Sequence, residues 1–340
     1  MTLSDAKRCA YLGPAATFTE AALIDLLTEH DLLDTVERVP MRSQNEMFDA
    51  VRSGEVDAAV VPIENSVEGG VPATLDALTR SGNLQIVAEA VVPVRFVLAA
   101  PPGTVTLETL QTFGTHPHAE AQTRLWMQAH APQAVYHPTG STAEAARVLG
   151  DAVRTGGGEP TTSGTAASAE VSYQAAIGPR LAAETYGLEV LADDIGENSG
   201  AQTRFVCVQR PGQQPEPTGW DRTTFVVGLA SDRSGALLEM LEQLSARGVN
   251  MSRIESRPTG DGLGLYQFSI DALGHVREAR MAEALRGIHR VAGRVQFLGS
   301  YPMAGAERTE LNGTKKAVDP RVADEAFEAA QTWLNEVTGG

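Results

Sequence analysis

Three short polar segments of the sequence could carry chemistry, because each one meets a short apolar run. They are Pro62-Ile63-Glu64-Asn65-Ser66, Gly114-Thr115-His116-Pro117-His118 and Thr203-Arg204-Phe205. Carboxylate, amide and hydroxyl groups at the carboxyl ends of strands lie where open α/β sheets bind ligands. A surface loop with ordinary capping residues is an equally good interpretation of the first segment taken alone.

The second segment ends a strand and opens a helix, whose unpaired N–H groups suit a carboxylate or a phosphate. Its two histidines could instead suggest a metal site, with His130 and His137 as further ligands. Helical spacing scatters these four side chains, however, and no carboxylate pattern completes a site. We therefore expect solvated or capping histidines and no metal.

In the third segment, strand alternation places Thr203 and Phe205 on one face and Arg204 on the other. A threonine hydroxyl is an uncommon catalytic group, and a β-branched residue at the start of a strand is the ordinary explanation. Arg204 could contact an anionic substrate or form a structural ion pair. The structural pair is favoured, because the Arg204 side chain should face away from that of Thr203.

The composition of the whole chain excludes several other chemistries. Its 340 residues include 27 basic and 43 acidic side chains, a net charge of −16, which disfavours nucleic acid and anionic membranes as partners. Lysine occurs only at positions 7, 315 and 316, so the chain between them offers no Schiff-base or P-loop lysine. With two cysteines, no apolar run of about 18 residues and no signal core, we expect a cytoplasmic protein without a disulfide framework.

The elements that must position these segments follow from the hydrophobic pattern. Up to residue 210, short apolar strands alternate with helical runs, three of which open with capping boxes at Thr17, Ser43 and Ser141. This alternation predicts α/β units with largely parallel sheets. Strands are expected at residues 9–12, 58–61, 85–92, 96–99, 111–113, 134–136, 173–177, 189–191 and 203–208. A stretch rich in glycine, threonine, serine and alanine, at about 154–168, predicts a flexible surface insertion.

A second domain follows a linker at 211–222 that begins with a run rich in proline, glycine and glutamine. Residues 223–302 have the pattern strand, helix, strand, strand, helix, strand, which is the βαββαβ order of the ferredoxin-like sandwich. The expected division is therefore a domain at 7–210, a domain at 223–302 and a tail at 303–340. The tail contains one amphipathic helix at about 322–337.

Together these motifs resemble those of the prephenate dehydratase family. The matching stretches are Tyr11-Leu12-Gly13-Pro14, Thr17-Phe18-Thr19-Glu20-Ala21-Ala22, Val61-Pro62-Ile63-Glu64-Asn65-Ser66, Ser141-Thr142-Ala143-Glu144-Ala145-Ala146, Ala182-Ala183-Glu184-Thr185-Tyr186-Gly187-Leu188 and Thr203-Arg204-Phe205. The second domain is similar to the ACT domain of this family, and the resemblance covers residues 8 to 301. Two departures are Thr115, where many members have serine, and Ala16, where many have glycine. No chorismate mutase segment precedes the dehydratase part, so we expect a monofunctional protein.

The resemblance implies an α/β fold with a two-lobed catalytic domain, similar to periplasmic binding proteins, and an active site between the lobes. The family converts prephenate to phenylpyruvate, water and carbon dioxide in L-phenylalanine biosynthesis, without a metal or an organic cofactor. Thr203 is then the expected general acid toward the leaving hydroxyl, supported by neighbours because a free threonine is a very weak acid. The expected substrate contacts are Thr17, Glu64, Asn65, Ser66, Thr115, Gln122, Arg204 and Phe205.

The same resemblance implies that L-phenylalanine binds the ACT domain as a feedback effector, in a homodimer or homotetramer. A glycine at a helix start lets backbone N–H groups approach a carboxylate, and the apolar helix face beside it can accept a benzyl group. The expected effector contacts are Gly235, Ala236, Leu237, Asn250, Met251, Glu255, Ser256, Arg257 and Pro258. The alternative is that Glu255 and Arg257 form a surface ion pair.

Two other functions stay open at this point. An arogenate dehydratase differs only in its substrate, which carries an amino group in place of the side-chain keto group, and nothing in the motifs separates the two. A non-catalytic, two-lobed amino-acid sensor is the third possibility. It is disfavoured because a sensor has no need of an acid at Thr203.

Overall fold

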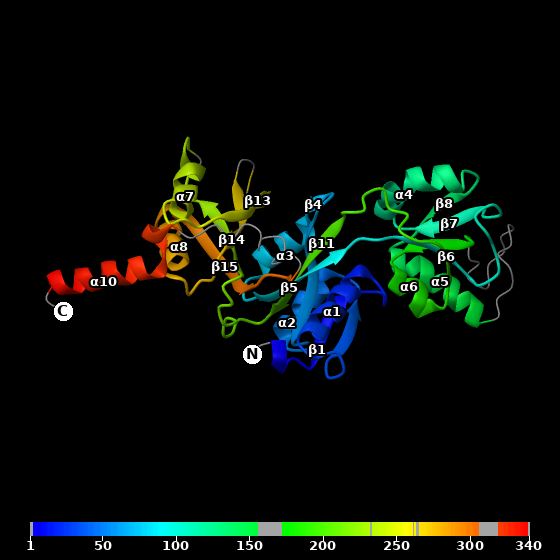
Figure 1. Ribbon diagram of the computed structural model, residues 1–340, viewed down its shortest axis with the longest axis horizontal. Coiled ribbons are helices and arrows are strands. Elements are labelled where there is room, and N and C mark those ends of the chain that lie inside the picture. Colours follow the sequence, from blue (N-terminus) through cyan, green and yellow to red (C-terminus); the bar gives the residue numbers. More distant parts are fainter. Residues whose placement is uncertain are drawn as a thin grey trace.

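The computed structural model describes residues 3–155, 172–305 except 232, 261, 263 and 264, and 319–338. The chain forms two α/β lobes and a C-terminal domain that lie in a row, with a helix projecting at the end opposite the second lobe (Figure 1). The insertion predicted at about 154–168 lies outside the described residues, apart from its first two positions.

The first lobe is built on one mixed sheet with the strand order β2-β1-β3-β11-β5, and the short β4 pairs with β3. The strands are β1 (Arg8–Leu12), β2 (Glu37–Met41), β3 (Ala58–Asn65), β4 (Gly69–Gly70), β5 (Gln85–Pro93) and β11 (Gln202–Gln209). One face is covered by α1 (Phe18–Glu29), and the other by α2 (Gln44–Ser53) and α3 (Pro72–Ser81). A short 3-10 helix, η1 (Leu3–Asp5), precedes β1.

The second lobe has the strand order β10-β6-β9-β7-β8. Its strands are β6 (Val97–Ala100), β7 (Thr112–Thr115), β8 (Val135–Pro138), β9 (Ala175–Gly178) and β10 (Glu189–Ala192). Its helices are α4 (Pro117–His130), α5 (Thr142–Arg154) and α6 (Arg180–Tyr186). The N-cap hydrogen bond of all three predicted capping boxes is present: Thr17, Ser43 and Ser141 each accept from the N–H three residues on.

Two chain segments connect the lobes, one from β5 to β6 and one from β10 to β11, and they are hydrogen-bonded to each other. Val94 donates its N–H to the Ala201 carbonyl at 2.8 Å, and Ile195 donates to Phe96 at 3.0 Å. Since the chain leaves the first lobe through β5 and returns through β11, β11 runs antiparallel to both β3 and β5. The expectation of largely parallel sheets therefore holds only in part, because β6 is also antiparallel to β9 and β10.

The C-terminal domain contains, in order, β12 (Asp221–Leu229), α7 (Ala236–Ser245), β13 (Met251–Pro258), β14 (Tyr266–Leu273), α8 (Ala279–Val291) and β15 (Ala292–Pro302). The order β13-β14-β12-β15, with antiparallel pairing throughout, is that of a ferredoxin-like βαββαβ sheet. One face packs on α7 and α8 through Phe225 and Ile270. The other face contributes Val226, Leu298 and Tyr301 to the core of the first lobe, so the two share one apolar interior.

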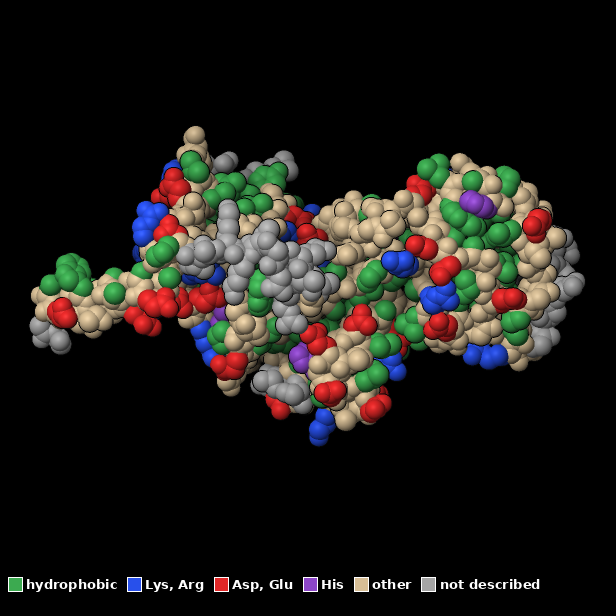
Figure 2. All heavy atoms as spheres, viewed as in Figure 1, with side chains coloured by type: hydrophobic (Ala, Val, Ile, Leu, Met, Phe, Trp, Pro, Cys, Tyr) green, Lys and Arg blue, Asp and Glu red, His purple; other side chains and the backbone are tan. Residues whose placement is uncertain are grey.

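The tail helix predicted at 322–337 is found as α10 (Asp324–Thr338), after the short η2 (Pro320–Val322). Figure 2 shows hydrophobic side chains on its surface, where Trp333 is 62% exposed and Leu334 and Val337 are also exposed. None of the helices in the described part of the chain is long and apolar enough to cross a membrane.

Candidate functional site

The candidate site begins at the pair formed by Thr203 and Asn65. Thr203 lies at the start of β11 and Asn65 ends β3, and the two residues are directly opposite each other. Asn65 Nδ2 donates a hydrogen bond to Thr203 Oγ1 at 2.9 Å. Because Phe205 packs in the core under α1, strand alternation places Thr203, which is 8% exposed, on that same face of the sheet.

Two further hydrogen bonds fix the orientation of the Asn65 amide. Its Oδ1 accepts from the backbone N–H groups of Val67 at 2.8 Å and Glu68 at 3.0 Å, so the nitrogen must point to Thr203. The threonine oxygen therefore accepts a hydrogen bond, and its own proton is left to be donated elsewhere. A fixed N–H donor also stabilises negative charge that grows on Oγ1 when that proton leaves. This arrangement suits a hydroxyl acting as an acid.

The strand ends that carry this pair are held together at their tips. The Ser66 N–H donates to the Gln202 carbonyl at 2.9 Å, and the Gln202 N–H donates to Ser66 Oγ at 2.9 Å. The serine hydroxyl thus closes the β3–β11 ladder one residue beyond Asn65. Ser66 itself is exposed.

The loop between β1 and α1 lies beside the second lobe. Thr17 Oγ1 donates to the Leu12 carbonyl at 2.9 Å and caps α1, while the Tyr186 hydroxyl of α6 donates to the Ala15 carbonyl at 3.1 Å. Ala16 has φ 66°, in the left-handed region that favours glycine. A glycine would adopt this backbone conformation without the strain that the Ala16 side chain brings.

On the second lobe, Thr115 ends β7 and is fully buried. Its Oγ1 donates to the Ile177 carbonyl at 2.7 Å, and the Tyr136 hydroxyl donates to the Thr115 carbonyl at 3.3 Å. Gln122 is half-buried on α4, and its backbone carbonyl accepts from the backbone N–H of Glu197 at 2.8 Å. Both residues therefore lie on the lobe opposite Thr203, held by backbone contacts.

One side-chain contact connects the two sides of the candidate site. Glu68, whose N–H is held by Asn65, approaches His118 at the start of α4, with Oε2 and Nδ1 3.0 Å apart. His116 caps α4 by accepting from the His118 N–H, so the first turn of this helix is not an open anion site. Burial, and then the nearby His118, lower the pKa of His116. Among the residues that the structure describes, no group of three or more His, Cys, Asp or Glu could hold a metal ion.

Comparison with known proteins identifies the family. The family model described as prephenate dehydratase matches residues 9–213. The chain is also 38% identical over 337 residues to the prephenate dehydratase of Mycobacterium tuberculosis strain H37Rv, covering 98% of this chain and 94% of that protein. The chain belongs to the prephenate dehydratase family.

Solved structures agree with this membership. The prephenate dehydratase of Arthrobacter aurescens in complex with L-Phe has a TM-score of 0.83 and 47% identity, over 98% of this chain and all of that one. A protein named GqqA, described as a novel type of quorum quenching acylase, has a TM-score of 0.73 and 27% identity, over 89% of this chain and all of that one. The fold is therefore also found in a protein described by a different activity.

Glu64 and Arg204, both expected to contact substrate, lie on the other face of the sheet from the Thr203–Asn65 pair. The two are opposite each other in the ladder, and Arg204 Nε donates to Glu64 Oε2 at 3.1 Å. Arg204 also reaches Glu89 of β5 and Asp271 of β14. The structure thus corrects the expectation that all of these residues share one pocket. The structural ion pair that strand alternation favoured for Arg204 is present, and Glu64 is one of its partners.

Of the other expected contacts in this prephenate dehydratase family member, three have structural partners of their own. Thr17 caps a helix, Ser66 closes a strand pair, and Phe205 is buried in the core beneath α1. Asn65 is the residue that the geometry brings to Thr203. The roles of Thr115 and Gln122 toward substrate stay predictions.

The segment expected to bind the effector contacts the first lobe. Arg257 forms a two-point ion pair with Asp76 of α3, at 3.1 and 2.8 Å, and the Glu255 carboxylate fills the space beside the Gly70 backbone. The alternative surface pair of Glu255 with Arg257 is therefore not what forms. Gly235, at the N-cap of α7, has φ 84°, as a glycine allows. All members of the expected set are partly or fully exposed, including the remaining six, Ala236, Leu237, Asn250, Met251, Ser256 and Pro258.

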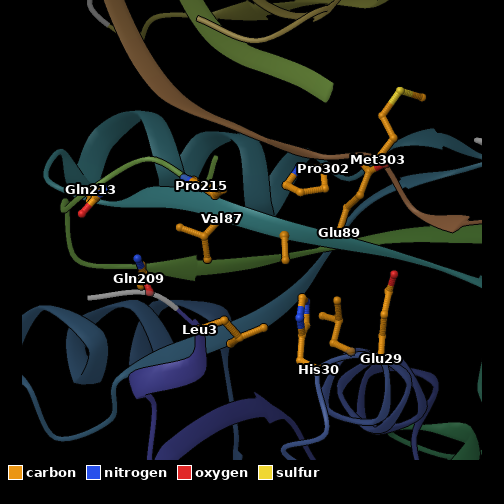
Figure 3. Close-up of a pocket in the computed structure, with 12 residues that line it drawn as sticks. Leu3, Glu29, His30, Val87, Glu89, Gln209, Gln213, Pro215, Pro302 and Met303 are labelled. Atoms are coloured by element: carbon orange, nitrogen blue, oxygen red, sulfur yellow. The ribbon is translucent and has the colours of Figure 1, made fainter. Parts of the chain in front are cut away.

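Figure 3 shows a separate cavity of about 210 Å³, whose lining residues do not include Thr203. It is bounded by α1, the first half of β5, the linker and the end of β15, with His30, Val87 and Met303 among its lining residues. Thr203 pairs with Val92 at the other end of β5. None of the expected site residues lines this cavity.

Sequence reasoning missed the charged residues that join the first lobe to the C-terminal domain. Glu89 and Asp271 are buried, and each is the one charged residue of its strand, while Arg222 is buried near the start of β12 beside other polar residues. A lone charge inside such a strand signals a buried ion pair, since an unpaired buried charge is too costly. That signal was available at Glu89 and Asp271, but it does not say which residues pair.

Proposed function

We propose that this chain converts prephenate to phenylpyruvate, with Thr203 as the proton donor and Asn65 as the group that orients and supports it. The observation that carries the proposal is the 2.9 Å hydrogen bond from Asn65 Nδ2 to Thr203 Oγ1, with the amide oxygen already held by two backbone N–H groups. The substrate is proposed from membership of the family, and the role of Thr203 as the acid is proposed from this geometry.

In the proposed reaction, the C–C bond to the ring carboxylate breaks and carbon dioxide leaves. The electron pair of that bond enters the ring, and the C–O bond to the ring hydroxyl breaks as the ring becomes aromatic. The leaving hydroxyl takes the Thr203 proton and departs as water, and Thr203 regains a proton from solvent. Because threonine is a very weak acid, proton transfer must accompany C–O cleavage, while Asn65 stabilises the growing charge on Oγ1.

The same geometry disfavours an acyl-transfer role such as the one named for GqqA. A threonine nucleophile needs a base that removes its proton. Among the hydrogen bonds of the described residues, the partner of the Thr203 hydroxyl is the Asn65 amide nitrogen, which donates and cannot accept. The hydroxyl is therefore arranged to give a proton to a substrate.

The C-terminal domain is proposed to be an ACT domain that binds L-phenylalanine and inhibits the reaction. Its βαββαβ order, the positive φ of Gly235 and the L-Phe complex of the Arthrobacter aurescens relative support this. ACT domains usually place such sites between subunits. Exposed Ile254 and Tyr266, on β13 and β14, support a homodimer or homotetramer through this edge of the sheet.

The catalytic proposal is tested by an isosteric change, Asn65→Asp. An aspartate oxygen can still accept from Val67 and Glu68, but the second oxygen cannot donate to Thr203 and repels negative charge there. We expect kcat for phenylpyruvate formation, followed by its ultraviolet absorbance in alkali, to fall by about 10²-fold or more. Wild-type kcat in this variant, or no phenylpyruvate from the wild-type protein, would refute the proposal. Assays with arogenate in parallel determine which substrate is preferred.

The regulatory proposal is tested by Gly235→Val, with Gly219→Val as the matched control. Both glycines have a positive φ, of 84° and 80°, and open space around them, so the backbone strain is alike. Only Gly235 belongs to the proposed effector segment. We expect L-phenylalanine inhibition to be lost in Gly235→Val and kept in Gly219→Val, with uninhibited turnover similar in both. Equal inhibition in the two variants would contradict this site.

A further inference from the structure

A buried ion network joins the strand that carries Thr203 to the C-terminal domain. The Arg204 side chain is 3% exposed and has three carboxylate partners, which are Glu64 at 3.1 Å, Glu89 at 3.1 Å and Asp271. The first two belong to β3 and β5, the strands on either side of β11. Asp271 belongs to β14 of the other domain. One guanidinium thus ties together three strands of the first lobe and one strand of the C-terminal domain.

Asp271 is the fixed end of this network. It is fully buried, and it accepts from Arg253 Nε at 2.8 Å and Nη2 at 3.1 Å, and from the Thr224 hydroxyl at 2.8 Å. Burial alone would raise the pKa of Asp271, but Arg204 and then Arg253 outweigh burial and hold the pKa far below its usual value. The ionised form of the carboxylate is therefore favoured, and it has Arg253 and Thr224 as hydrogen-bond partners in its own domain.

The network acts on the residues next to the proposed acid. Arg204 follows Thr203 directly, and Glu64 precedes Asn65 directly, so the Arg204–Glu64 ion pair and the Thr203–Asn65 hydrogen bond are consecutive rungs of one ladder. Just beyond Arg204 the register of the ladder shifts, so regular pairing does not hold this end by itself. A displacement of the strand ends would move the Thr203 hydroxyl, and about 1 Å of misplacement can cost about 10²-fold in rate.

We propose that Asp271 of the C-terminal domain is a positioning residue for the reaction, which acts on Thr203 through Arg204. Asp271 does not touch the substrate, because it is buried on the opposite face of the β3–β11 pair. Its role is to hold Arg204, and hence the Thr203–Asn65 pair, in the geometry for proton donation. The inference rests on the proposed function, since it needs Thr203 to be the proton donor.

The test compares kcat and KM for the full-length wild-type protein, Asp271→Asn, Thr203→Ala and the double variant. Asp271→Asn keeps the shape of the side chain and can still accept from Thr224, but it removes the charge that holds Arg204. We expect kcat to fall by about 10- to 100-fold, with KM changed by less than about threefold. In the Thr203→Ala background the same substitution should change kcat by less than about twofold, because its effect passes through Thr203.

A purely structural role gives a different pattern, in which Asp271→Asn lowers kcat by the same factor in both backgrounds. That result, or wild-type kcat in Asp271→Asn, would overturn the proposal. Asp76→Asn is the matched control, because it breaks another ion pair between the two domains, the one with Arg257, which lies away from β11. Its kcat should stay at the wild-type value, and a loss equal to that of Asp271→Asn would likewise overturn the proposal.

A second variant guards against a failure of Asp271→Asn to fold. Replacing a buried ion pair by apolar side chains of similar volume is often neutral for stability. The triple variant Arg204→Met/Arg253→Met/Asp271→Leu also removes the second arginine that pairs with Asp271, and it leaves Glu89 paired with Arg222. It should therefore fold, yet it should lose kcat because the anchor is gone. Wild-type kcat in this folded variant would refute the positioning role. If Thr203→Ala keeps wild-type kcat, Thr203 is not the acid, and both the proposed function and the positioning role are refuted. If the Asp271 variants keep wild-type kcat while Thr203→Ala loses it, only the positioning role is refuted.

Discussion

The two faces of the β3–β11 strand pair carry different kinds of polar contact, although the residues that make them are direct neighbours in the sequence. On the face under α1, Thr203 and Asn65 share one hydrogen bond with a fixed direction. On the other face, Arg204 and Glu64 belong to a network of charges that reaches Asp271 of the C-terminal domain. One face is arranged for proton donation, and the other is arranged for anchoring.

This difference changes how the C-terminal domain is understood. The domain supplies Asp271 to Arg204 and Arg222 to Glu89, and it shares an apolar interior with the first lobe. A chain ending at Arg210 would leave buried charges without these partners. Loss of activity in such a truncated chain would therefore not report on regulation by L-phenylalanine. Single substitutions in the full-length chain test each face separately.

The largest expected effect is on stability, from Arg204→Met. This change leaves the Glu89 and Asp271 carboxylates buried with fewer partners, so the free energy of unfolding should fall by about 3–5 kcal/mol. Thr203→Ala, on the other face, removes one hydrogen bond and should cost only about 0.5–1.5 kcal/mol. Urea unfolding of both variants in one buffer measures the difference. Equal losses of unfolding free energy in the two variants would contradict the assignment of anchoring to one face and proton donation to the other.

The next effect is a pH dependence of the Asp271 anchor. Its pKa is held below the ordinary value of 3.8, so its ionised form contributes stability that is fully present above about pH 4. As the pH falls below that value, the unfolded chain binds a proton that the folded chain resists, and the contribution is lost. The stability gap between wild type and Asp271→Asn, measured by chemical unfolding, should therefore narrow from about pH 7 to about pH 3. A gap that stays constant over this range would show that the charge of Asp271 does not stabilise the fold.

The smallest expected effect is on turnover, from Glu64→Gln. Glu64 lies on the anchoring face, its side chain is the least buried of the three Arg204 partners, and the amide can still accept from Arg204. We expect kcat to fall by less than about tenfold, whereas loss of a catalytic acid or base lowers kcat by about 10²–10⁴-fold. A loss in the larger range would place Glu64 in the chemistry and remove the distinction between the faces.

Much of the fold could be predicted from local sequence. The capping boxes at Thr17, Ser43 and Ser141 placed three helices, and apolar runs placed most strands within one or two residues of their ends. The edge strand β2 was missed. Its residues Glu37, Arg38 and Pro40 interrupt the apolar alternation typical of a strand, and an edge strand buries few of its side chains. The direction of β11 was also missed, since it depends on the path of the chain between the lobes.

The candidate site could be predicted only in outline. The motifs led to Thr203 and Asn65, and strand alternation already separated Arg204 from Thr203. Alternation along β3 also separates Glu64 from Asn65, but it does not give their faces, because the register between β3 and β11 shifts just before Glu64. That Glu89 and Asp271 pair with Arg204 could not be predicted. Glu89 lies 115 positions and Asp271 lies 67 positions from Arg204 in the sequence, and they meet it only because two sheets pack together.

The central claim is that the Thr203 hydroxyl gives the proton to the leaving group. The most direct measurement is kcat for phenylpyruvate formation by Thr203→Ala and Thr203→Ser, each shown by its unfolding curve to be folded. The alanine variant should lose about 10²–10⁴-fold in kcat, and the serine variant, which keeps a hydroxyl for Asn65 to support, should recover part of that loss. Near wild-type kcat in Thr203→Ala would contradict the account.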